Sequence, residues 1–573
     1  MKNQEIAKIF NDIARFLQIE GVAFKPYAYE RAAASLEGLK DDVSKLYLQG
    51  GRRALEEIEG IGKAMSDHIE EYLKTGKIKI HEEFKKGLPV NMDELLRVEG
   101  LGPKKIKVLY EKLGVKNIKD LEKALKKHEI APLFGFGETT EKNIAQGIAF
   151  VKQNKGRALL QEILPGAREV LRKLEELPEV KKASLAGSLR RRKETIGDVD
   201  FLVVSSSPEK VMNFFVALPG VKKIWGKGGT KASVHTEAGF DMDLRVVPAK
   251  SYGAALQYFT GSQAHNIVTR KIAIDKGLKL SEYGVFKGAT MIAGKTEEEV
   301  YKAIGLPYIE PELREDQGEV EAALEGKLPK LVELKDIKGD LHCHSNWNGG
   351  EHSIEVMAQT AMARGYEYIG ISDHSKTLKI ENGLNEKQLL EQHEAIKKIN
   401  AKFQKENLKF RVLHGVEADI LKDGSIDIKN EVLAQLDYVI ASVHLNTKME
   451  QKEMMARIEK AMKNPNVDIL AHPTGRIVNQ RDEYQIDFDK MLRLAKGTGT
   501  ILEINSSARL DLRDFYIRRA KAEGVKMIIN TDSHHKDHMA LMEYGVSQAR
   551  RGWAEKNDIV NTNSVHKLLR YFE

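Results

Sequence analysis

The sequence has 573 residues, of which 42% are hydrophobic and 31% are charged, a balance typical of globular domains and not of a disordered or collagen-like chain. Lys and Arg outnumber Asp and Glu by 91 to 84, and the net charge of +7 permits a nucleic-acid partner without requiring one. The sequence contains no apolar run of the roughly 20 residues that span a membrane and no signal-peptide pattern. The single cysteine, Cys343, excludes an internal disulfide and fits a reducing cytoplasm.

The first third of the chain is predicted to be helical and to repeat one hairpin. The segments LEEIEGIGKAMSDHIEEYL and LLRVEGLGPKKIKVLYEKL each place a Gly-x-Gly turn before an amphipathic stretch, and PLFGFGETTEKNI is a looser third copy. Such a turn leaves backbone N–H groups free at the start of a helix, where a phosphate can bind. A tight turn without a ligand is the alternative, which the repetition disfavours. The copies resemble helix-hairpin-helix motifs, and the resemblance makes DNA-binding candidates of Gly60, Gly62, Gly100 and Gly102.

Two short strands in the middle of the chain carry carboxylates in a pattern typical of a metal site. Asp198 and Asp200 lie two residues apart in DVDFLVV, so a strand projects both from one face. Adjacent carboxylates repel each other unless a cation lies between them, and oxygen ligands suit Mg²⁺. Asp243, in FDMDLRVV, offers a third carboxylate, as two-metal phosphoryl transfer requires. A solvated strand end is the alternative for an isolated pair. Groups suited to phosphates precede the pair: Gly187, Ser188 and either Arg190 or Arg191.

These motifs resemble the palm of nucleotidyltransferases, and YFTGS with the later His265-Asn266 resembles the hinge and nucleotide pocket of family X DNA polymerases. Residues 1 to about 316 thus resemble a family X repair polymerase, the class that includes DNA polymerase beta. The resemblance implies that Asp198 and Asp200 bind two Mg²⁺ ions and that Asp243 activates the primer 3′-hydroxyl. It further implies triphosphate binding by Gly187, Ser188 and Arg191, nucleotide contact by Tyr258, Phe259, Gly261 and Asn266, and template contact by Arg270. Core packing is the alternative for the two aromatic residues.

One position departs from the polymerase beta pattern. In polymerase beta-like relatives, a lysine in the helix after the first hairpin forms a Schiff base with an abasic sugar. Matching GIGKAMSDHI to that helix places His68 at the lysine position. An imidazole cannot form that imine, so we do not expect lyase activity by this route, and the nearby Lys63 is a weak substitute.

After residue 336, short apolar runs alternate with helical stretches, which is typical of βα units around a parallel sheet or barrel. Active groups of such folds collect at the carboxyl ends of the strands, and imidazole with carboxylate suits Zn²⁺, Mn²⁺ or Fe²⁺. A single histidine at a strand end is more often a packing residue than a ligand. Here, however, ligand-type residues follow successive apolar runs: His342, His344, His374, Glu417, His444, His472, Asp532 and His534.

Their order resembles the PHP (polymerase and histidinol phosphatase) domain, a distorted seven-stranded (β/α) barrel with up to three metal ions. The resemblance implies that those eight residues bind Mn²⁺ or Zn²⁺ and that the site hydrolyses a phosphoester. Family members commonly show Trp-Ser-Asp-Gly after the first histidine pair, with the Asp as a ligand, whereas this chain places Gly349 at the Asp position. Either Asn348 or Glu351 compensates, or one metal position is weaker.

The predicted fold is multidomain: a helical helix-hairpin-helix region, an α+β palm with a small thumb, and an α/β distorted (β/α)7 barrel. The expected domains are an N-terminal helical DNA-binding domain at 1–90, a fingers-like helical region with the second hairpin at 91–150, a palm at 151–250, a thumb at 251–316, a linker at 317–335 and a PHP domain at 336–573.

The main functional hypothesis is a DNA-directed polymerase that fills short gaps during repair, fused to a metal-dependent 3′–5′ exonuclease that also cuts at abasic sites. Its substrates would be gapped or primer–template DNA and deoxynucleoside triphosphates. We expect a cytoplasmic, nucleoid-associated monomer without a membrane partner. One alternative is a nucleotidyltransferase fused to a small-molecule phosphatase, since fold alone does not choose a substrate. The other is a DNA-binding polymerase with an inactive PHP scaffold, which Gly349 suggests.

Overall fold

The computed structural model describes residues 2–20, 22, 25–39, 42–58, 60–87, 90–96, 98, 101–153 and 157–573. The chain forms two compact units, Met1–Lys155 with Asn479–Arg481, and Gly156–Val478 with Asp482–Glu573. Within the described ranges, no helix combines the length and the apolarity that crossing a bilayer needs.

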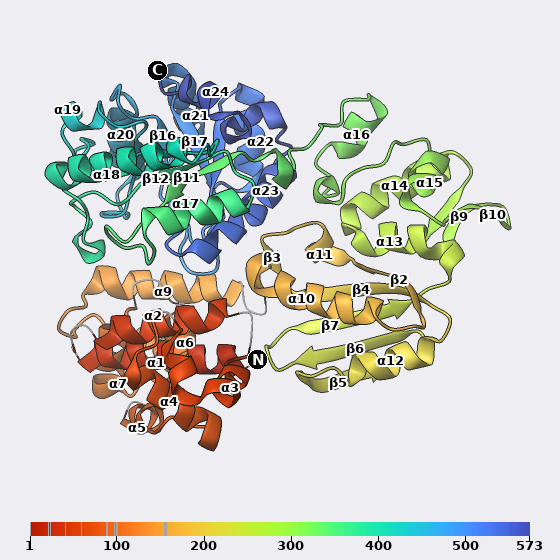
Figure 1. Cartoon of the computed structure of the whole chain (residues 1–573). Helices are drawn as coiled ribbons and strands as arrows, with labels where there is room; N and C mark the ends of the chain where they lie inside the picture. The colour runs from red at the N-terminus through yellow and green to blue at the C-terminus, as the bar shows by residue number, and fades with distance from the viewer. Residues whose placement is uncertain are drawn as a thin grey trace. The chain divides into compact units, whose positions relative to one another are not determined.

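The first unit is helical, as predicted (Figure 1, red to orange). The long α1 buries its amphipathic face, including Ile6, Phe10 and Ile13, in a cluster with residues of α2, α3 and α4. A second cluster joins α6 to α9 around Leu109 and Leu121. The helices are α1 (Lys2–Glu20), α2 (Lys25–Gly38), α3 (Val43–Glu56), α4 (Lys63–Thr75), α5 (Lys79–Gly87), α6 (Met92–Leu96), α7 (Pro103–Leu113), α8 (Ile118–Lys126) and α9 (Glu138–Gln153).

The second unit begins with a five-stranded sheet in the order β2-β4-β7-β6-β5, in which β4 and β7 run parallel. Its strands are β2 (Val180–Leu185), β4 (Asp198–Ser205), β5 (Val221–Lys227), β6 (Lys231–Thr236) and β7 (Asp241–Val246). A separate pair joins β1 (Ala158–Leu159) to β3 (Thr195–Ile196). The helices of this palm are α10 (Leu160–Glu175), α11 (Gly187–Arg190) and α12 (Pro208–Val216).

The two faces of the palm sheet have different partners. Phe201 of β4 packs in a cluster with α10 and α12, whereas its neighbour Leu202 packs with α13 (Tyr252–Thr260) on the opposite face. Because side chains alternate along a strand, Asp198 and Asp200 share the face of Leu202. The carboxylates predicted to bind metal therefore lie on the α13 side of the sheet.

The thumb combines α13 and α14 (Gln263–Asp275) with a three-stranded antiparallel sheet and α15 (Glu297–Ala303). Its strands are β8 (Lys279–Ser281), β9 (Gly284–Lys287) and β10 (Thr290–Ala293). The segment 317–335, predicted to be a linker, contains α16 (Glu319–Leu324) and is packed on the thumb. Val320 and Ala323 join the thumb cluster, and the buried Glu319 lies 2.7 Å from His265 Nδ1. Apolar residues three positions apart thus turn this segment into a fixed connection.

The PHP region contains two parallel sheets, β11-β12-β13 and β14-β15-β16-β17-β18. Isolated bridges pair His374 with Glu417 and Cys343 with Ser533, and so join the two sheets. Only two residues separate β13 from β14, so these two strands together form one position of the barrel. The eight strands therefore occupy seven positions, the number predicted. The strands are β11 (Gly339–Cys343), β12 (Tyr368–Ile371), β13 (Arg411–His414), β14 (Glu417–Asp419), β15 (Ile440–Ser442), β16 (Ile469–Leu470), β17 (Ile501–Asn505) and β18 (Met527–Asn530).

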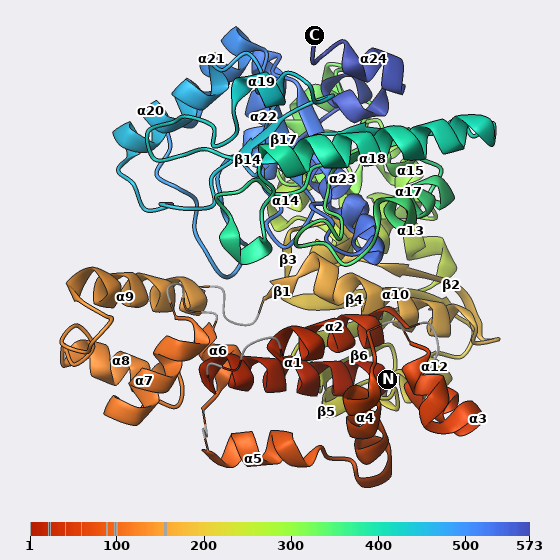
Figure 2. The same cartoon turned by 60° about the vertical axis from the view of Figure 1, so that its left-hand side comes forward.

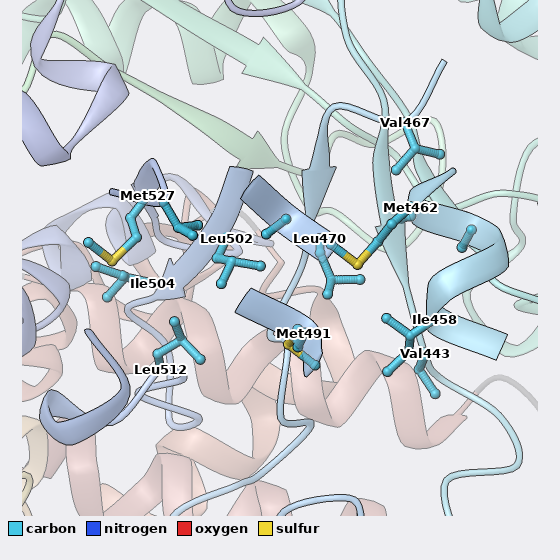
Figure 3. Packing of buried hydrophobic residues seen from close by; sticks show 14 of the residues in the cluster. Val443, Ile458, Met462, Val467, Leu470, Met491, Leu502, Ile504, Leu512 and Met527 are labelled. Carbon is cyan, nitrogen blue, oxygen red and sulfur yellow. The ribbon is translucent and has the colours of Figure 1, made fainter. Parts of the chain in front are cut away.

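Helices surround these strands in both views of the chain (Figures 1 and 2). Figure 3 shows Leu470, Leu502 and Ile504 of the strands packed with Ile458 and Met491 of the helices. Burying one such side chain contributes roughly 1.5–3 kcal/mol. The helices are α17 (Ile354–Ala363), α18 (Glu386–Lys405), α19 (Asn430–Leu433), α20 (Gln451–Met462), α21 (Phe488–Thr498), α22 (Asp514–Glu523), α23 (Met542–Arg551) and α24 (Val565–Leu569).

The palm and the PHP barrel contact each other directly within the second unit. Val478, Leu510 and Tyr544 of the barrel belong to the same apolar cluster as the palm core. The guanidinium of Arg476, only 2% exposed, donates to both carboxylate oxygens of Glu194 at 3.3 and 2.7 Å. The barrel is therefore packed against the palm, with which it shares an apolar cluster and an ion pair.

Candidate active sites

The acidic side chains of the palm meet across β4 and β7. The parallel register places Asp200 directly opposite Asp243. A further acid on β7, Asp241, is engaged by Trp225 Nε1 at 2.9 Å and His235 Nδ1 at 2.7 Å. The three predicted ligands are Asp198, Asp200 and Asp243, of which Asp243 also lies 3.9 Å from Lys231 Nζ.

Burial and like charges act together on Asp200. Its burial, together with the carboxylates of Asp198 and Asp243, raises the pKa of Asp200 to about 7. A divalent cation relieves this repulsion, so the three residues fit the metal pair of phosphoryl transfer. Gly187 has φ +60° at this point, and a Cβ there would lie 2.1 Å from Asp200 Oδ2. Glycine is therefore required where the α11 turn approaches the carboxylate.

The groups predicted to hold phosphates lie on the same turn. The hydroxyl oxygen of Ser188 is buried and has no hydrogen-bond partner. Arg191 donates from Nε to Glu315 at 3.0 Å and from its terminal nitrogen to a backbone carbonyl of α13. Arg190 instead forms a two-pronged ion pair with Glu297 of α15, at 2.9 and 2.6 Å. Arg190 is thus paired with the thumb and Arg191 with Glu315, and phosphate binding by Arg191 stays a prediction.

The residues predicted to contact the nucleotide are grouped at the end of α13. The rings of Tyr258 and Phe259 are partly exposed and meet edge to face, with centroids 5.1 Å apart. Gly261 ends the helix with φ +68°, and Asn266 donates its amide to the carbonyl of Tyr258 at 2.7 Å. Arg270 lies further along α14 and is partly exposed. The structure thus brings the hinge residues together; their contact with a nucleotide stays a prediction.

The hairpins of the first unit expose helix N-termini at the predicted glycines. Gly60 has φ +82°, and Gly62 is the N-cap of α4 without a side-chain hydrogen bond. Gly102 occupies the same place before α7, while Gly100 lies outside the described residues. Because these caps are glycines, the first N–H groups of both helices are not covered by a capping side chain.

The histidine at the predicted lyase position is already engaged. His68 Nε2 lies 2.9 Å from the hydroxyl of Tyr29, and the two rings stack at 5.9 Å. Lys63, the weak substitute, is the first residue of α4 and is exposed. The local structure therefore gives His68 a packing role and does not supply it with a nucleophilic amine.

The predicted ligands of the barrel converge on one carboxylate, that of Glu417 at the start of β14. Its oxygens lie 2.6 Å from His374 Nδ1, 3.1 Å from His444 Nε2, 3.1 Å from His472 Nε2 and 3.3 Å from His342 Nε2. Donor atoms form three overlapping groups, each within 4.8 Å: His344 with His374 and His534, His342 with His344 and Glu417, and His374 with Glu417 and His444. Asp532 lies 3.6 Å from His342 and 3.4 Å from His344.

The chemistry of these donors fits divalent cations. Although burial raises it, the surrounding histidines 444, 342 and 374 hold the pKa of the Glu417 carboxyl well below its usual range. Buried atoms without a hydrogen-bond partner would be costly in a site built for protein contacts alone. The atoms without a well-aligned hydrogen bond are His342 Nε2, His344 Nδ1 and Nε2, His374 Nδ1, His472 Nδ1 and Glu417 Oε2. His374 Nδ1 and Glu417 Oε2 lie 2.6 Å apart without such alignment, and imidazole nitrogens that crowd a carboxylate in this way are suited to a metal ion between them.

Two acidic residues that the sequence did not single out orient the histidines. Glu503, fully buried in β17, lies 2.7 Å from His342 Nδ1 and accepts a hydrogen bond from the His472 backbone at 2.8 Å. Asp419 lies 3.2 Å from His444 Nδ1. Carboxylates behind metal-binding histidines fix the ring and its tautomer. The sequence did offer a signal for Glu503, which is an acidic residue inside the apolar run ILEIN. A buried charge at such a position needs a partner.

Four family models match parts of the chain. They are a helix-hairpin-helix domain at residues 1–78, a SAM-like helix-hairpin-helix tandem at 92–149, a DNA polymerase beta thumb at 255–315 and a PHP domain at 340–507. Their order agrees with the order of the folded parts, from helical hairpins through the thumb to the barrel.

Similar proteins cover the whole chain or its halves. The chain is 38% identical to a DNA polymerase/3′-5′ exonuclease PolX of Bacillus subtilis (strain 168), over 100% of both chains. It is 26% identical to DNA polymerase lambda of Arabidopsis thaliana over 54% of this chain and 62% of that protein. A probable phosphatase of Thermoanaerobacter sp. (strain X514) is 30% identical over 41% of this chain and 94% of its own length.

Palm carboxylates on one sheet and a histidine-rich barrel cluster together define a protein with two distinct sites suited to divalent cations. The chain belongs to the bacterial family X DNA polymerases that carry a C-terminal PHP domain.

Proposed function

We propose that this protein is a DNA-directed DNA polymerase that fills short gaps in DNA repair and whose PHP domain is a metal-dependent 3′–5′ exonuclease. DNA and deoxynucleoside triphosphates are its substrates, and divalent metal ions are its cofactors. The observation that best supports the polymerase activity is the strand register that places Asp200 opposite Asp243, next to the turn at Gly187. The 38% sequence identity to a DNA polymerase/3′-5′ exonuclease over the full length of both chains supports both activities.

In the polymerase site, each residue has a part that its position supports. Asp198, Asp200 and Asp243 would hold Mg²⁺, which supplies charge to the reacting phosphate. Asp243 would accept the proton of the primer 3′-hydroxyl. The buried hydroxyl of Ser188 and the guanidinium of Arg191 would hold the triphosphate in line. Helix starts at Gly62 and Gly102 would bind the DNA backbone.

In the barrel, the histidines and Glu417 would hold Mn²⁺ or Zn²⁺, which supplies Lewis-acid charge and an activated water. The cluster presents donor atoms of both imidazole and carboxylate, a set that favours these ions over Ca²⁺. Glu503 would keep His342 in the orientation that directs Nε2 toward the cation. We propose a monomer, because one chain supplies all the residues of both sites.

The palm assignment is tested by primer extension on gapped DNA. Asp198→Ala with Asp200→Ala should abolish nucleotide addition, because the cations lose two of three carboxylates. The exposed Asp275→Ala on α14 is the matched control and should extend primers like the wild type. Undiminished synthesis by the double variant would eliminate the palm assignment.

The barrel assignment is tested on the same protein with a labelled 3′ end. His342→Ala with His344→Ala should abolish Mn²⁺-dependent trimming while primer extension survives. The exposed His566→Ala is the control for loss of an imidazole. Trimming that persists in the double variant would place the nuclease elsewhere.

A second candidate is a phosphatase of small molecules in the barrel. It is favoured by the 30% identity to a probable phosphatase over 41% of this chain and 94% of that protein. The hairpins argue for DNA, since a small-molecule enzyme has no need of them. Hydrolysis of a chromogenic phosphomonoester faster than removal of a DNA 3′ nucleotide would reverse the preference.

A further inference from the structure

A cavity of about 360 Å³ is lined by the loop after β11, by the start of α17 and by α18. Its volume is within the range of ligand pockets, roughly 300–1,000 Å³. The lining includes the partly buried Trp347 and the exposed Lys398 and Lys402. Because the two lysines are four residues apart on α18, they share one face of that helix. The cavity therefore combines one aromatic ring with two neighbouring cations.

Neither lysine is paired within the protein. Among the described residues, the side chains of Lys398 and Lys402 have no ion pair and no hydrogen bond. The acid one turn earlier, Glu394, is instead held by Lys397 at 2.8 Å, and Lys398 acts on it only at longer range. Like charges four residues apart destabilise a helix, and the one acidic side chain in the cavity lining, Glu355, cannot balance both lysines. An anionic ligand would relieve their repulsion.

The loop that carries Trp347 is fixed to the predicted metal ligands of the barrel. The backbone N–H of Trp347 donates to Ser345 Oγ at 3.3 Å, and Ser345 directly follows His344. The next residue, Asn348, donates its side-chain amide to the carbonyl of His374 at 3.0 Å. Three residues of chain span at most roughly 11 Å, so the Cα atoms of Trp347 and His344 are no further apart than that. The aromatic wall of the cavity is therefore within reach of a DNA strand whose end lies at the histidine cluster.

We propose that this cavity, the Trp347 pocket, holds a nucleotide of the single DNA strand whose 3′ end is trimmed in the barrel. The base stacks on Trp347, and Lys398 and Lys402 bind the phosphates beside it. An aromatic ring with basic groups is the combination that binds single strands without reading their sequence. Charge complementarity favours DNA over an apolar peptide, which would leave both lysines unpaired. The inference rests on the proposed exonuclease and adds a strand-binding subsite to it.

Occupancy of the pocket is measured by the fluorescence of Trp347 in the full-length protein. The chain has three tryptophans, so Trp225→Phe with Trp553→Phe leaves Trp347 as the only one. A chelator is present throughout, so that no strand is cut. Because a base stacked on an indole ring quenches its emission, titration with a short oligothymidylate should give saturable quenching. Emission that the oligonucleotide does not change would overturn the proposal.

The contribution of the lysines is measured by the same titration at several salt concentrations. Lys398→Ala with Lys402→Ala should weaken the binding and lower its log–log salt slope by about 0.7 per lysine, the value for phosphate contacts of a single strand. Lys397→Ala with Lys405→Ala is the matched control, because it removes the same charge from α18 outside the cavity lining. The control should keep the wild-type slope. An equal loss in both double variants would overturn the proposal.

Trimming assays show whether the pocket serves the reaction of the barrel. Trp347→Leu keeps an apolar side chain without an aromatic face. It should raise the KM for a single-stranded oligonucleotide about tenfold relative to the KM for a small chromogenic phosphodiester, which is too short to reach the pocket. Trp347→Phe restores a ring and should recover most of this difference. Equal changes for the two substrates would overturn the proposal. If the wild type trims no DNA, the exonuclease proposal fails by itself, and quenching of Trp347 would still support the pocket as a strand-binding site.

Discussion

At Asp200 a single ionisation links the fold of the palm to its chemistry. Burial and the charges of Asp198 and Asp243 raise the pKa of Asp200 to about 7. Below that pH the metal-free carboxyl carries a proton, which a cation must displace. We therefore expect the Mg²⁺ affinity of the polymerase site to fall about tenfold for each pH unit below pH about 7, and to level off above it.

The measurement is the Mg²⁺ concentration for half-maximal primer extension between pH 5.5 and about 8.5. Asp200→Asn has no such proton to lose, so its residual activity should show no inflection near pH 7. A flat Mg²⁺ dependence in the wild type would contradict the raised pKa.

A second residue-scale prediction concerns Glu503, which touches metal ligands without being one of them. Glu503→Gln keeps the shape of the side chain but removes the charge 2.7 Å from His342 Nδ1. We expect trimming of DNA 3′ ends to fall about tenfold to 100-fold, with a matching loss of Mn²⁺ affinity. Primer extension should not change, because the palm has its own metal ligands.

Residue types and spacing predicted the ligands but not the groups behind them. Asp198 and Asp200 could be recognised because two positions on a strand share a face. Glu503 also lies on a strand, but the residue that it orients, His342, is 161 residues away in the sequence, so no local spacing relates the two.

At the scale of elements, the two hairpins make the same prediction about DNA. Lys63 and Lys104 lie in the first turns of α4 and α7, next to the N-caps Gly62 and Gly102, and both are exposed. Each lysine that neutralises a phosphate releases counterions, so DNA affinity should fall as salt rises. Lys63→Ala with Lys104→Ala should reduce the log–log salt slope by about one per lysine, equally for unrelated DNA sequences.

Fluorescence anisotropy with a gapped duplex at several salt concentrations measures that slope. Lys405→Ala, at the exposed end of α18, removes the same charge without a hairpin and should leave the slope unchanged. If the double variant kept the wild-type slope, the hairpins would not be the phosphate-binding elements.

Elements were predictable where the pattern is local. The Gly-x-Gly repeats and the alternation of apolar runs with helices indicated the hairpins and the βα units. The segment 317–335 was not predictable in the same way. Its charged composition indicated a linker, but Val320 and Ala323 share one face of α16 and pack into the thumb. Two apolar residues among charges do not predict a packed helix from sequence alone, because the surface against which they pack belongs to another part of the chain.

At the scale of the whole molecule, one carboxylate connects the barrel to the polymerase site. Glu315 accepts from Arg191 Nε at 3.0 Å and from a terminal nitrogen of Arg551 at 3.0 Å. The same nitrogen of Arg551 donates to the Arg191 carbonyl at 2.9 Å, and Asp514 holds its other nitrogen at 2.6 Å. Arg551 belongs to α23 of the barrel and is almost fully buried. A barrel residue thus fixes the arginine proposed to hold the triphosphate.

Without Arg551, Glu315 would be balanced chiefly by Arg191 and would draw it away from the phosphates. Arg551→Ala should therefore raise the KM for deoxynucleoside triphosphates about tenfold, since 1.4 kcal/mol is a factor of about ten and a charged hydrogen bond contributes about this much. Arg551→Lys keeps the charge and should recover part of the loss, whereas a substitution that merely loosened the interface would not be rescued. Arg172→Ala, which breaks an exposed ion pair on α10, is the control. Steady-state single-nucleotide insertion measures the effect, and an unchanged KM in Arg551→Ala would show that the barrel holds the palm in place without tuning its nucleotide site.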